Sequence, residues 1–298
     1  MRVFVTGATG NIGSRVVEDL IAAGHQVIGV YRSEAKAASL AATGAELYQG
    51  SIAEPESLRE GAARADAVIH LAFNHDFSRF VQNCEDDRAV IATLGAALAG
   101  SDRPLIVTSG TPIANTVPGQ PALEGNPIVG SATHPRAATE EAANLVAAAG
   151  GNISVVRLPQ VHDPVTQGLI TPVIAMYRDK GVCSYVGEGR SRWPAAHVVD
   201  VARLYRLAVE RAEPGARYHA VAEEGVAMRD IAGTIGQRLG LPVQSIEAAE
   251  APAYFGWMAH YAELDMPASS AETRTKLGWA PTGPTLVEDL ARLELPGA

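Results

Sequence analysis

The feature that most constrains the fold is a glycine-rich loop near the N-terminus. Residues 6–13 read Thr-Gly-Ala-Thr-Gly-Asn-Ile-Gly, after an apolar stretch at 3–5 and before a helical stretch over 13–23. In this order Gly7 permits a tight turn, Gly10 lets the backbone approach a pyrophosphate, and Gly13 lets the helix pack on the strand. The phosphates would then lie on free N–H groups at the positive end of the helix.

This loop predicts a dinucleotide site, and a glycine-rich turn without a ligand is the alternative. The expected cofactor contacts in the loop are Gly7, Thr9, Gly10, Asn11, Ile12 and Gly13.

Short apolar runs alternate with helical stretches through the first half of the chain. This rhythm is typical of an α/β protein with a Rossmann-type, doubly wound parallel sheet. The runs predicted as strands are 26–30, 46–48, 68–72, 105–108 and 153–157, and those predicted as helices are 33–43, 58–63, 86–99 and 135–149.

The rhythm weakens after about residue 158. Helices are expected at 171–179, 200–211, 228–239 and 270–277, with a strand at 218–221. We therefore predict an NAD(P)-binding Rossmann core over 1–160. Residues 161–298 would form mainly a small C-terminal α/β substrate lobe, with some segments returning to the core. The stretch 110–134 is rich in Pro, Gly and Asn and is expected to be an active-site loop or lid.

Composition excludes several function classes. A formal charge of −9 argues against a nucleic-acid partner. No apolar run approaches the ~18 residues of a membrane span, and no signal peptide is visible at the N-terminus. Cys84 and Cys183 form no Cys-x-x-Cys motif, which fits a reducing cytoplasm. No metal-ligand spacing is present, so no metal site is expected. We expect a cytoplasmic protein with a small-molecule substrate. A homodimer stays open.

The end of the second strand bears on the choice of cofactor. An NAD site usually has Asp or Glu here for the ribose 2′-OH, and residues 29–33 (Gly-Val-Tyr-Arg-Ser) contain neither. Arg32 and Ser33 offer a guanidinium and a hydroxyl that suit a 2′-phosphate, which favours NADP (NADPH) over NAD. The alternative is that Arg32 is a surface residue stacked on adenine.

With these motifs the chain resembles the short-chain dehydrogenase/reductase superfamily, in its extended or atypical branch that includes the NAD-dependent epimerase/dehydratases. The glycine loop and later landmarks at 68–72, 107–110, 156–159 and 197–202 carry the resemblance to about residue 210. It implies that Leu71, Ala72 and Pro159 also contact the cofactor.

Typical members of the superfamily carry a Ser or Thr and a Tyr-x-x-x-Lys motif. Ser109 matches the Ser/Thr position, but no tyrosine here is followed by a lysine four residues later. Lining up the helix starts puts Arg136 at the Tyr position and Glu140 at the Lys position. These two residues could form an i,i+4 pair, or Arg136 could hold an anionic or carbonyl group.

Another group must then supply a proton. His75 follows a strand end in the expected cofactor cleft and is the first candidate, and His134 is the second. For either, the alternative is a loop histidine bonded to backbone. Trp193 could form an apolar wall for substrate, and Trp257 belongs to an aromatic cluster at 254–258 that lines a pocket or, as the favoured alternative, packs in the core. Asp200 is expected to be a helix N-cap.

These residues predict an NADP-dependent oxidoreductase acting on a small carbonyl or alcohol. A sugar epimerase or dehydratase is the second enzyme hypothesis. A dinucleotide-binding sensor without turnover is the third, because the Tyr and Lys are missing.

Overall fold

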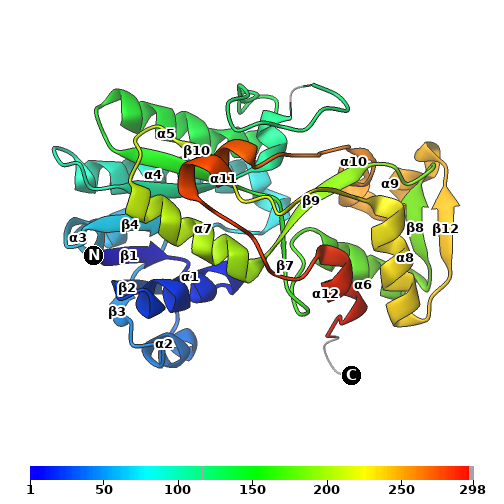
Figure 1. Cartoon of the computed structure of the whole chain (residues 1–298), viewed down its shortest axis with the longest axis horizontal. Helices are drawn as coiled ribbons and strands as arrows, with labels where there is room; N and C mark the ends of the chain where they lie inside the picture. The colour runs from blue at the N-terminus through cyan, green and yellow to red at the C-terminus, as the bar shows by residue number, and fades with distance from the viewer. Residues whose placement is uncertain (116, 295–298) are drawn as a thin grey trace.

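A parallel sheet forms the centre of the computed structural model, which describes residues 1–115 and 117–294. Within these ranges seven strands pair in the order β10-β6-β5-β4-β1-β2-β3 (Figure 1). The order reverses between β1 and β4, which creates the crevice where such sheets bind ligands. The α/β Rossmann prediction is confirmed. The strands are β1 (Arg2–Thr6), β2 (Gln26–Tyr31), β3 (Glu46–Gln49), β4 (Ala67–His70), β5 (Leu105–Gly110), β6 (Ile153–Leu158) and β10 (Arg217–His219).

Helices cover both faces of the sheet. Successive strand residues point to opposite faces, and the residues on both faces are apolar. Val3 and Val5 pack with α1 (Asn11–Ala22) and α7 (Val198–Arg211), whereas Phe4 between them faces the opposite layer. That opposite layer contains α3 (Arg59–Ala63), α4 (Phe80–Leu98) and α5 (Ala138–Ala148), and α2 (Glu34–Ala41) packs beside β2 and β3.

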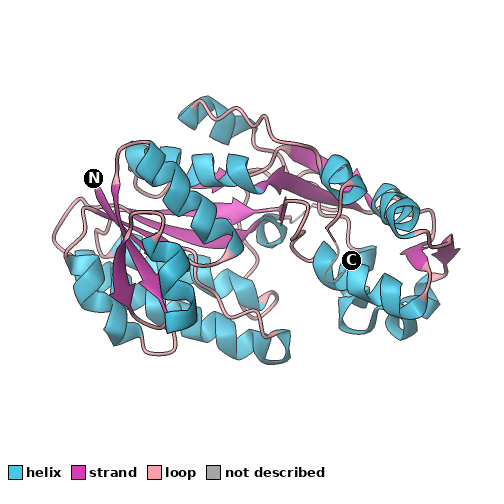
Figure 2. Cartoon of the chain, turned by 90° about the horizontal axis from the view of Figure 1, so that it is seen from below, coloured by secondary structure: helices cyan, strands magenta, loops and turns pink. Residues whose placement is uncertain are grey.

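The second half of the chain builds a lobe beside the core (Figure 2). One of its sheets has the order β11-β9-β7, and β12 pairs with β8. The chain also returns to the core, since β10 pairs with β6 and α11 (Ala271–Leu277) packs on α7 and β10. The lobe elements are β7 (Gln160–His162), α6 (Ile170–Lys180), β8 (Cys183–Val186), β9 (Arg192–His197), β11 (Glu223–Ala227), α8 (Met228–Leu239), β12 (Val243–Ile246), α9 (Ala251–Phe255), α10 (Ala259–Glu263) and α12 (Leu286–Ala291).

Short 3-10 helices connect several of these elements. They are η1 (Pro55–Leu58), η2 (Phe77–Arg79), η3 (Thr111–Ala114), η4 (Pro135–Ala137), η5 (Ala248–Glu250) and η6 (Gly256–Met258). Two of them, η2 and η6, carry aromatic residues of the candidate site.

One local prediction stays open and another is wrong. The stretch 110–134, predicted as an active-site loop or lid, is anchored at Glu124, whose carboxylate accepts hydrogen bonds from Thr273 N (2.8 Å) and Oγ1 (2.7 Å) of α11, and its role at the site stays a prediction. The prediction for Asp200 is the wrong one. Asp200 does not cap α7. His197 occupies that position, and the Asp200 carboxylate instead accepts from the backbone N–H of Gly283 (2.7 Å).

Both cysteines are free and buried. Burial raises the pKa of Cys84 to about 11, so its thiol is protonated at neutral pH. Across the described ranges, no helix combines the length and apolar character that crossing a membrane requires. The same ranges contain no cluster of three His, Cys, Asp or Glu side chains arranged to hold a metal ion.

Candidate active site

The glycine loop has the geometry of a pyrophosphate cradle. Gly7 has φ +71°, and a Cβ there would lie 2.8 Å from the backbone N of Ala72. A Cβ on Gly13 would lie 2.0 Å from the Gly7 carbonyl oxygen, so the helix can approach the turn only because this residue has no side chain. Gly10 is exposed, and a Cβ there would meet protein only at 3.2 Å. The loop therefore needs Gly7 and Gly13 for its own packing and leaves space at Gly10 for a ligand.

Hydrogen-bond donors at the start of α1 are available to that ligand. The N–H of Gly10 bonds back to Gly7 (2.9 Å), and no side chain of the described residues caps the helix. Asn11 is exposed, while Thr9 and Ile12 are half-buried, with Ile12 packed on the core. The first turn of α1 can thus bind phosphates through backbone N–H groups. The loop fits the dinucleotide expected there.

Other expected cofactor residues lie along the same edge of the sheet. Ala72 touches the Gly7 turn, and half-buried Leu71 packs on the core beside it. Pro159 is half-buried between β6 and β7. Arg32 and Ser33 are exposed at the end of β2, and the Ser33 hydroxyl makes no capping bond to α2. These positions are consistent with cofactor contacts, which remain predictions.

A chain of buried polar groups runs from β1 to the segment before α5. Thr6 Oγ1 bonds to His70 Nδ1 (2.6 Å), and His70 Nε2 bonds to Asp87 Oδ1 (3.0 Å). Arg136 Nη1 donates to Asp87 Oδ2 (2.8 Å), and its Nη2 donates to the Thr108 carbonyl (2.7 Å). This hydrogen-bond network links the strand before the glycine loop to the strand that carries Ser109.

Asp87 is the centre of this hydrogen-bond network and is ionised. Burial by itself raises the pKa of Asp87, but the Arg136 charge and the hydrogen bond from His70 outweigh it and bring the pKa well below its usual range. Arg136 is in turn fixed by Asp87, by Thr108 and by Phe73, whose ring centre lies 4.0 Å below the guanidinium. These contacts fix the guanidinium in place, and a contact of Arg136 with substrate stays a prediction.

Glu140 does not pair with Arg136, so the i,i+4 prediction is wrong. Its carboxylate binds Arg157 through two hydrogen bonds (2.7 and 2.9 Å), and both side chains are fully buried. Arg217 on β10 adds a third contact at 3.3 Å. The position aligned with the missing lysine thus holds a structural ion pair between α5, β6 and β10.

Two polar atoms near Arg136 lack such partners. Ser109 Oγ and His134 Nδ1 are buried, and neither has a hydrogen-bond partner among the described side chains and backbone. A buried polar atom without a partner is costly, so such atoms often mark a ligand contact. The bond from Arg136 to Thr108 brings the segment bearing His134 beside the end of β5 that bears Ser109. Ser154, His162, Trp193 and Tyr218 also have a buried polar atom without a partner among the described residues, but of the six only Ser109 and His134 were predicted as catalytic residues.

His75 and His134 differ in their surroundings. His75 is exposed, and its ring lies edge-on to Phe73 at 5.4 Å. His134 is half-buried, with its ring 6.4 Å from that of Phe80. The pKa of each lies below its ordinary value, first because nearby protein atoms exclude water and then because the Arg136 charge disfavours a second cation.

The two tryptophans predicted to meet substrate lie in different environments. Trp193 has no exposed surface and packs among apolar side chains of the lobe, so its prediction as a substrate wall is wrong. Trp257 is 48% exposed and stacks on Phe77 of the core. In the 254–258 cluster, Phe255 and Met258 belong to the lobe core and Trp257 does not.

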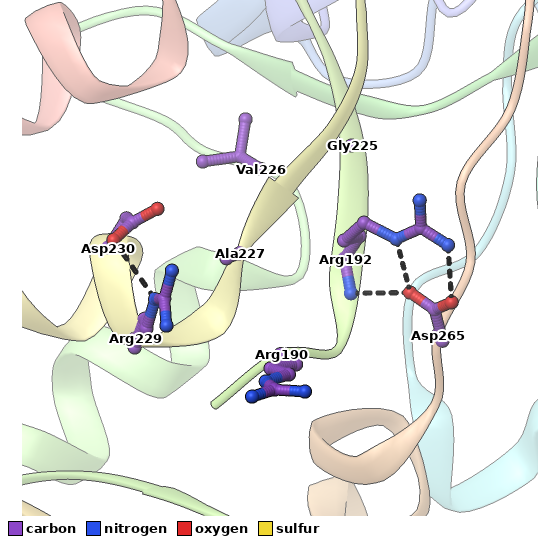
Figure 3. A pocket seen from close by; sticks show the side chains of 8 residues that line it. All are labelled: Arg190, Arg192, Gly225, Val226, Ala227, Arg229, Asp230 and Asp265. Atoms are coloured by element: carbon purple, nitrogen blue, oxygen red, sulfur yellow. Dashed lines mark hydrogen bonds and ion pairs between the residues drawn. The ribbon is translucent and has the colours of Figure 1, made fainter. Parts of the chain in front are cut away.

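A pocket of about 650 Å³ opens in the lobe, away from the glycine loop (Figure 3). Its arginines are largely neutralised by acidic neighbours. Arg192 binds Asp265 through its backbone N–H (2.8 Å), Nε (3.0 Å) and Nη2 (2.7 Å), and Arg229 lies 3.6 Å from Asp230. The balance of charge argues against a strong anion site here. The lining residues are Arg190, Arg192, Gly225, Val226, Ala227, Arg229, Asp230 and Asp265.

Comparison with known proteins assigns the family. The model of the NAD dependent epimerase/dehydratase family matches residues 3–222. The chain belongs to this family. Its members are NAD-dependent enzymes, and the resemblance to the extended short-chain dehydrogenase/reductases is confirmed.

The relatives of this epimerase/dehydratase family member have varied activities. An uncharacterised protein of Schizosaccharomyces pombe is 42% identical and covers 98% of both chains. A Stigmatella aurantiaca enzyme, 4-hydroxy-2-methyl-3-oxo-4-farnesyl-3,4-dihydroquinoline-1-oxide ketoreductase, is 28% identical over 99% of this chain and 91% of its own. Among solved structures, dTDP-glucose 4,6-dehydratase from Streptomyces venezuelae with NAD bound has a TM-score of 0.77 at 20% identity, covering 98% of this chain and 95% of that one.

Sequence reasoning missed the residues that organise the site of this family member. Asp87 lies on a helix with no motif of its own. His70 lies in the 68–72 landmark, but no role was assigned to it, and the two side chains meet only in the folded chain. A clustering of phenylalanines at 73–80, directly after β4, was the one available signal for the aromatic residues around His75.

Proposed function

We propose that the protein is an NADP-dependent oxidoreductase that interconverts a small carbonyl compound and its alcohol. The observation that carries this proposal is the pair of unpartnered buried atoms, Ser109 Oγ and His134 Nδ1, beside the edge of the sheet that holds the glycine loop. The ketoreductase relative supports carbonyl chemistry. The bound cofactor would supply or accept the hydride.

The chain's own residues have separate tasks in this proposal. Ser109 donates a hydrogen bond to the substrate oxygen, where negative charge develops during reduction. His134 gives the proton, because its ring is half-buried and one nitrogen lacks a partner. His75 is the second candidate. Arg136 orients the segment that bears His134 and does not itself touch substrate.

Two features support NADP rather than NAD. Arg32 and Ser33 are exposed where the 2′-phosphate would lie, and the end of β2 has no acidic residue. The nearest carboxylate in sequence, Glu34, faces the Tyr31 hydroxyl, which donates to it at 3.4 Å. A guanidinium on a phosphate forms a strong charge-assisted contact.

Replacing Arg32 with Ala should remove most of a preference for NADPH over NADH. The lost charge-assisted contact corresponds to about 1.5–3 kcal/mol, or roughly a 10- to 150-fold weaker affinity for NADPH. Affinity for NADH should hardly change. Titration calorimetry with both cofactors measures this, with Arg178→Ala, another exposed arginine, as the matched control. Equal affinities of the wild type for the two cofactors would contradict the assignment.

Turnover separates this proposal from its rivals. A carbonyl-dependent loss of NADPH absorbance is expected of an oxidoreductase. Tight binding of NADPH without any such loss would favour a dinucleotide sensor. Conversion of a sugar substrate with no net change in cofactor would favour an epimerase or dehydratase.

A further inference from the structure

We propose that the substrate carries an aromatic ring. Phe77, which follows β4 of the Rossmann core, and Trp257 of the lobe would bind this ring. The inference deepens the proposed function and depends on it for the reaction, but the ring site itself can be tested without turnover.

The distribution of phenylalanine is the first observation. The chain has five phenylalanines, and three of them, Phe73, Phe77 and Phe80, lie within eight residues directly after β4. All three are only half-buried, whereas Phe4 and Phe255 are fully buried in the two cores. The aromatic side chains after β4 are therefore not needed to fill a core, and they leave apolar surface open to a ligand.

The geometry of these rings is the second observation. Phe77 and Trp257 stack with centroids 4.9 Å apart and planes 21° apart, although 180 residues separate them in the chain. Trp257 is 48% exposed, so the surface that Phe77 does not cover is available to another ring. Phe80 lies 5.7 Å from Phe77 and Phe73 lies 6.3 Å from Phe80, which extends the aromatic surface along η2 and the start of α4.

The position of the cluster connects it to the reaction. Ala72 touches the Gly7 turn of the cofactor loop, and Phe73 is the next residue. His75 lies 6.3 Å from the Phe77 ring, and His134 lies 6.4 Å from the Phe80 ring. Both candidate proton donors thus border the aromatic surface.

These neighbours narrow the chemistry of the occupant. Aromatic rings attract another ring through stacking and edge-to-face contacts that a saturated ring cannot reproduce. Among the described residues, His75 is the one titratable side chain in the ring contacts of Phe77 and Trp257, and burial together with the Arg136 charge lowers its pKa, which favours the neutral imidazole. The nearby charge of Arg136 is already bound to Asp87. The surface therefore fits an uncharged aromatic carbonyl compound better than a sugar nucleotide.

Two aldehydes of similar size provide the test of turnover. Benzaldehyde and cyclohexanecarbaldehyde differ in aromaticity but carry the same reacting group. With NADPH and the full chain, kcat/KM for benzaldehyde should be about three- to tenfold higher. Trp257→Ala and Phe77→Ala should each remove most of this preference, and Trp257→Phe should retain it. Val81→Ala changes an exposed apolar residue of α4 and serves as the control.

Fluorescence provides a readout that does not depend on turnover. Of the three tryptophans, Trp193 and Trp279 are buried, so benzaldehyde added with NADP⁺ should change mainly the emission of Trp257. The change should saturate in the wild type and disappear in Trp257→Phe. Saturable binding without reduction would support the ring site and contradict the oxidoreductase proposal. Equal reduction of both aldehydes by the wild type and Trp257→Ala would overturn the ring site and leave that proposal standing. Absence of both binding and preference would also overturn the ring site.

Discussion

Gly10→Val is expected to abolish dinucleotide binding while the protein remains folded. A Cβ at this position meets only the Gly7 carbonyl oxygen at 3.2 Å, so the loop can accept a side chain with a small adjustment. The branched side chain would nevertheless occupy the approach of the pyrophosphate to the start of α1. Titration with NADPH should show no saturable binding, and the thermal midpoint should stay close to that of the wild type.

Gly13→Ala is the matched comparison for this variant. Its Cβ would lie 2.0 Å from the Gly7 carbonyl oxygen, so the helix must move away from the turn. This overpacking should cost about 1–3 kcal/mol of stability and lower the thermal midpoint. A folded Gly10→Val protein that binds NADPH as tightly as the wild type would show that the pyrophosphate does not lie at this loop.

Removal of the proton-donating histidine should have the largest effect on turnover. His134→Ala should lower kcat for carbonyl reduction by about 10²–10⁴, which is the usual contribution of general acid catalysis. His75→Ala should have a much smaller effect, because its ring is exposed. Steady-state kinetics with NADPH at saturation measure both variants.

The pH profile adds a signature that a structural role would not produce. Only the protonated imidazole can act as the acid in reduction, so kcat should rise as the pH falls through the pKa of His134. That pKa is lowered by burial and by the Arg136 charge, so half of the rise should occur below the ordinary value of about 6.5. His134→Gln should lose this dependence. Full activity of His134→Ala with an unchanged pH profile would exclude His134 as the general acid. A loss of kcat and of the pH dependence in His75→Ala would assign that role to His75.

The Rossmann core could be predicted from the sequence because its signals are local. The glycine order at 7, 10 and 13, the strand before it and the helix after it all lie within about twenty residues. The apolar strands β4, β5 and β6 are likewise short runs that can be seen in the sequence itself. Helix starts were harder to predict, since α4 begins at Phe80 rather than 86.

The organisation of the site could not be predicted because it depends on contacts between distant elements. Alignment placed Glu140 beside Arg136, but its partners Arg157 and Arg217 come from strands that pair only in the folded sheet. Similarly, Trp193 could be assigned to the lobe core only after β9 was found between β7 and β11. Side-chain pairing across a sheet follows from its strand order, which a single sequence does not specify.

Hydride transfer between NADPH and a carbonyl compound is the proposed reaction of this protein. It is tested most directly with NADPH carrying deuterium at the transferable position of the nicotinamide and with benzaldehyde as substrate. We expect benzyl alcohol with one deuterium on the carbinol carbon, detected by mass spectrometry, and much less of it with His134→Ala. Binding of the deuterated cofactor without formation of labelled alcohol, from benzaldehyde or from any other carbonyl compound tried, would contradict the account.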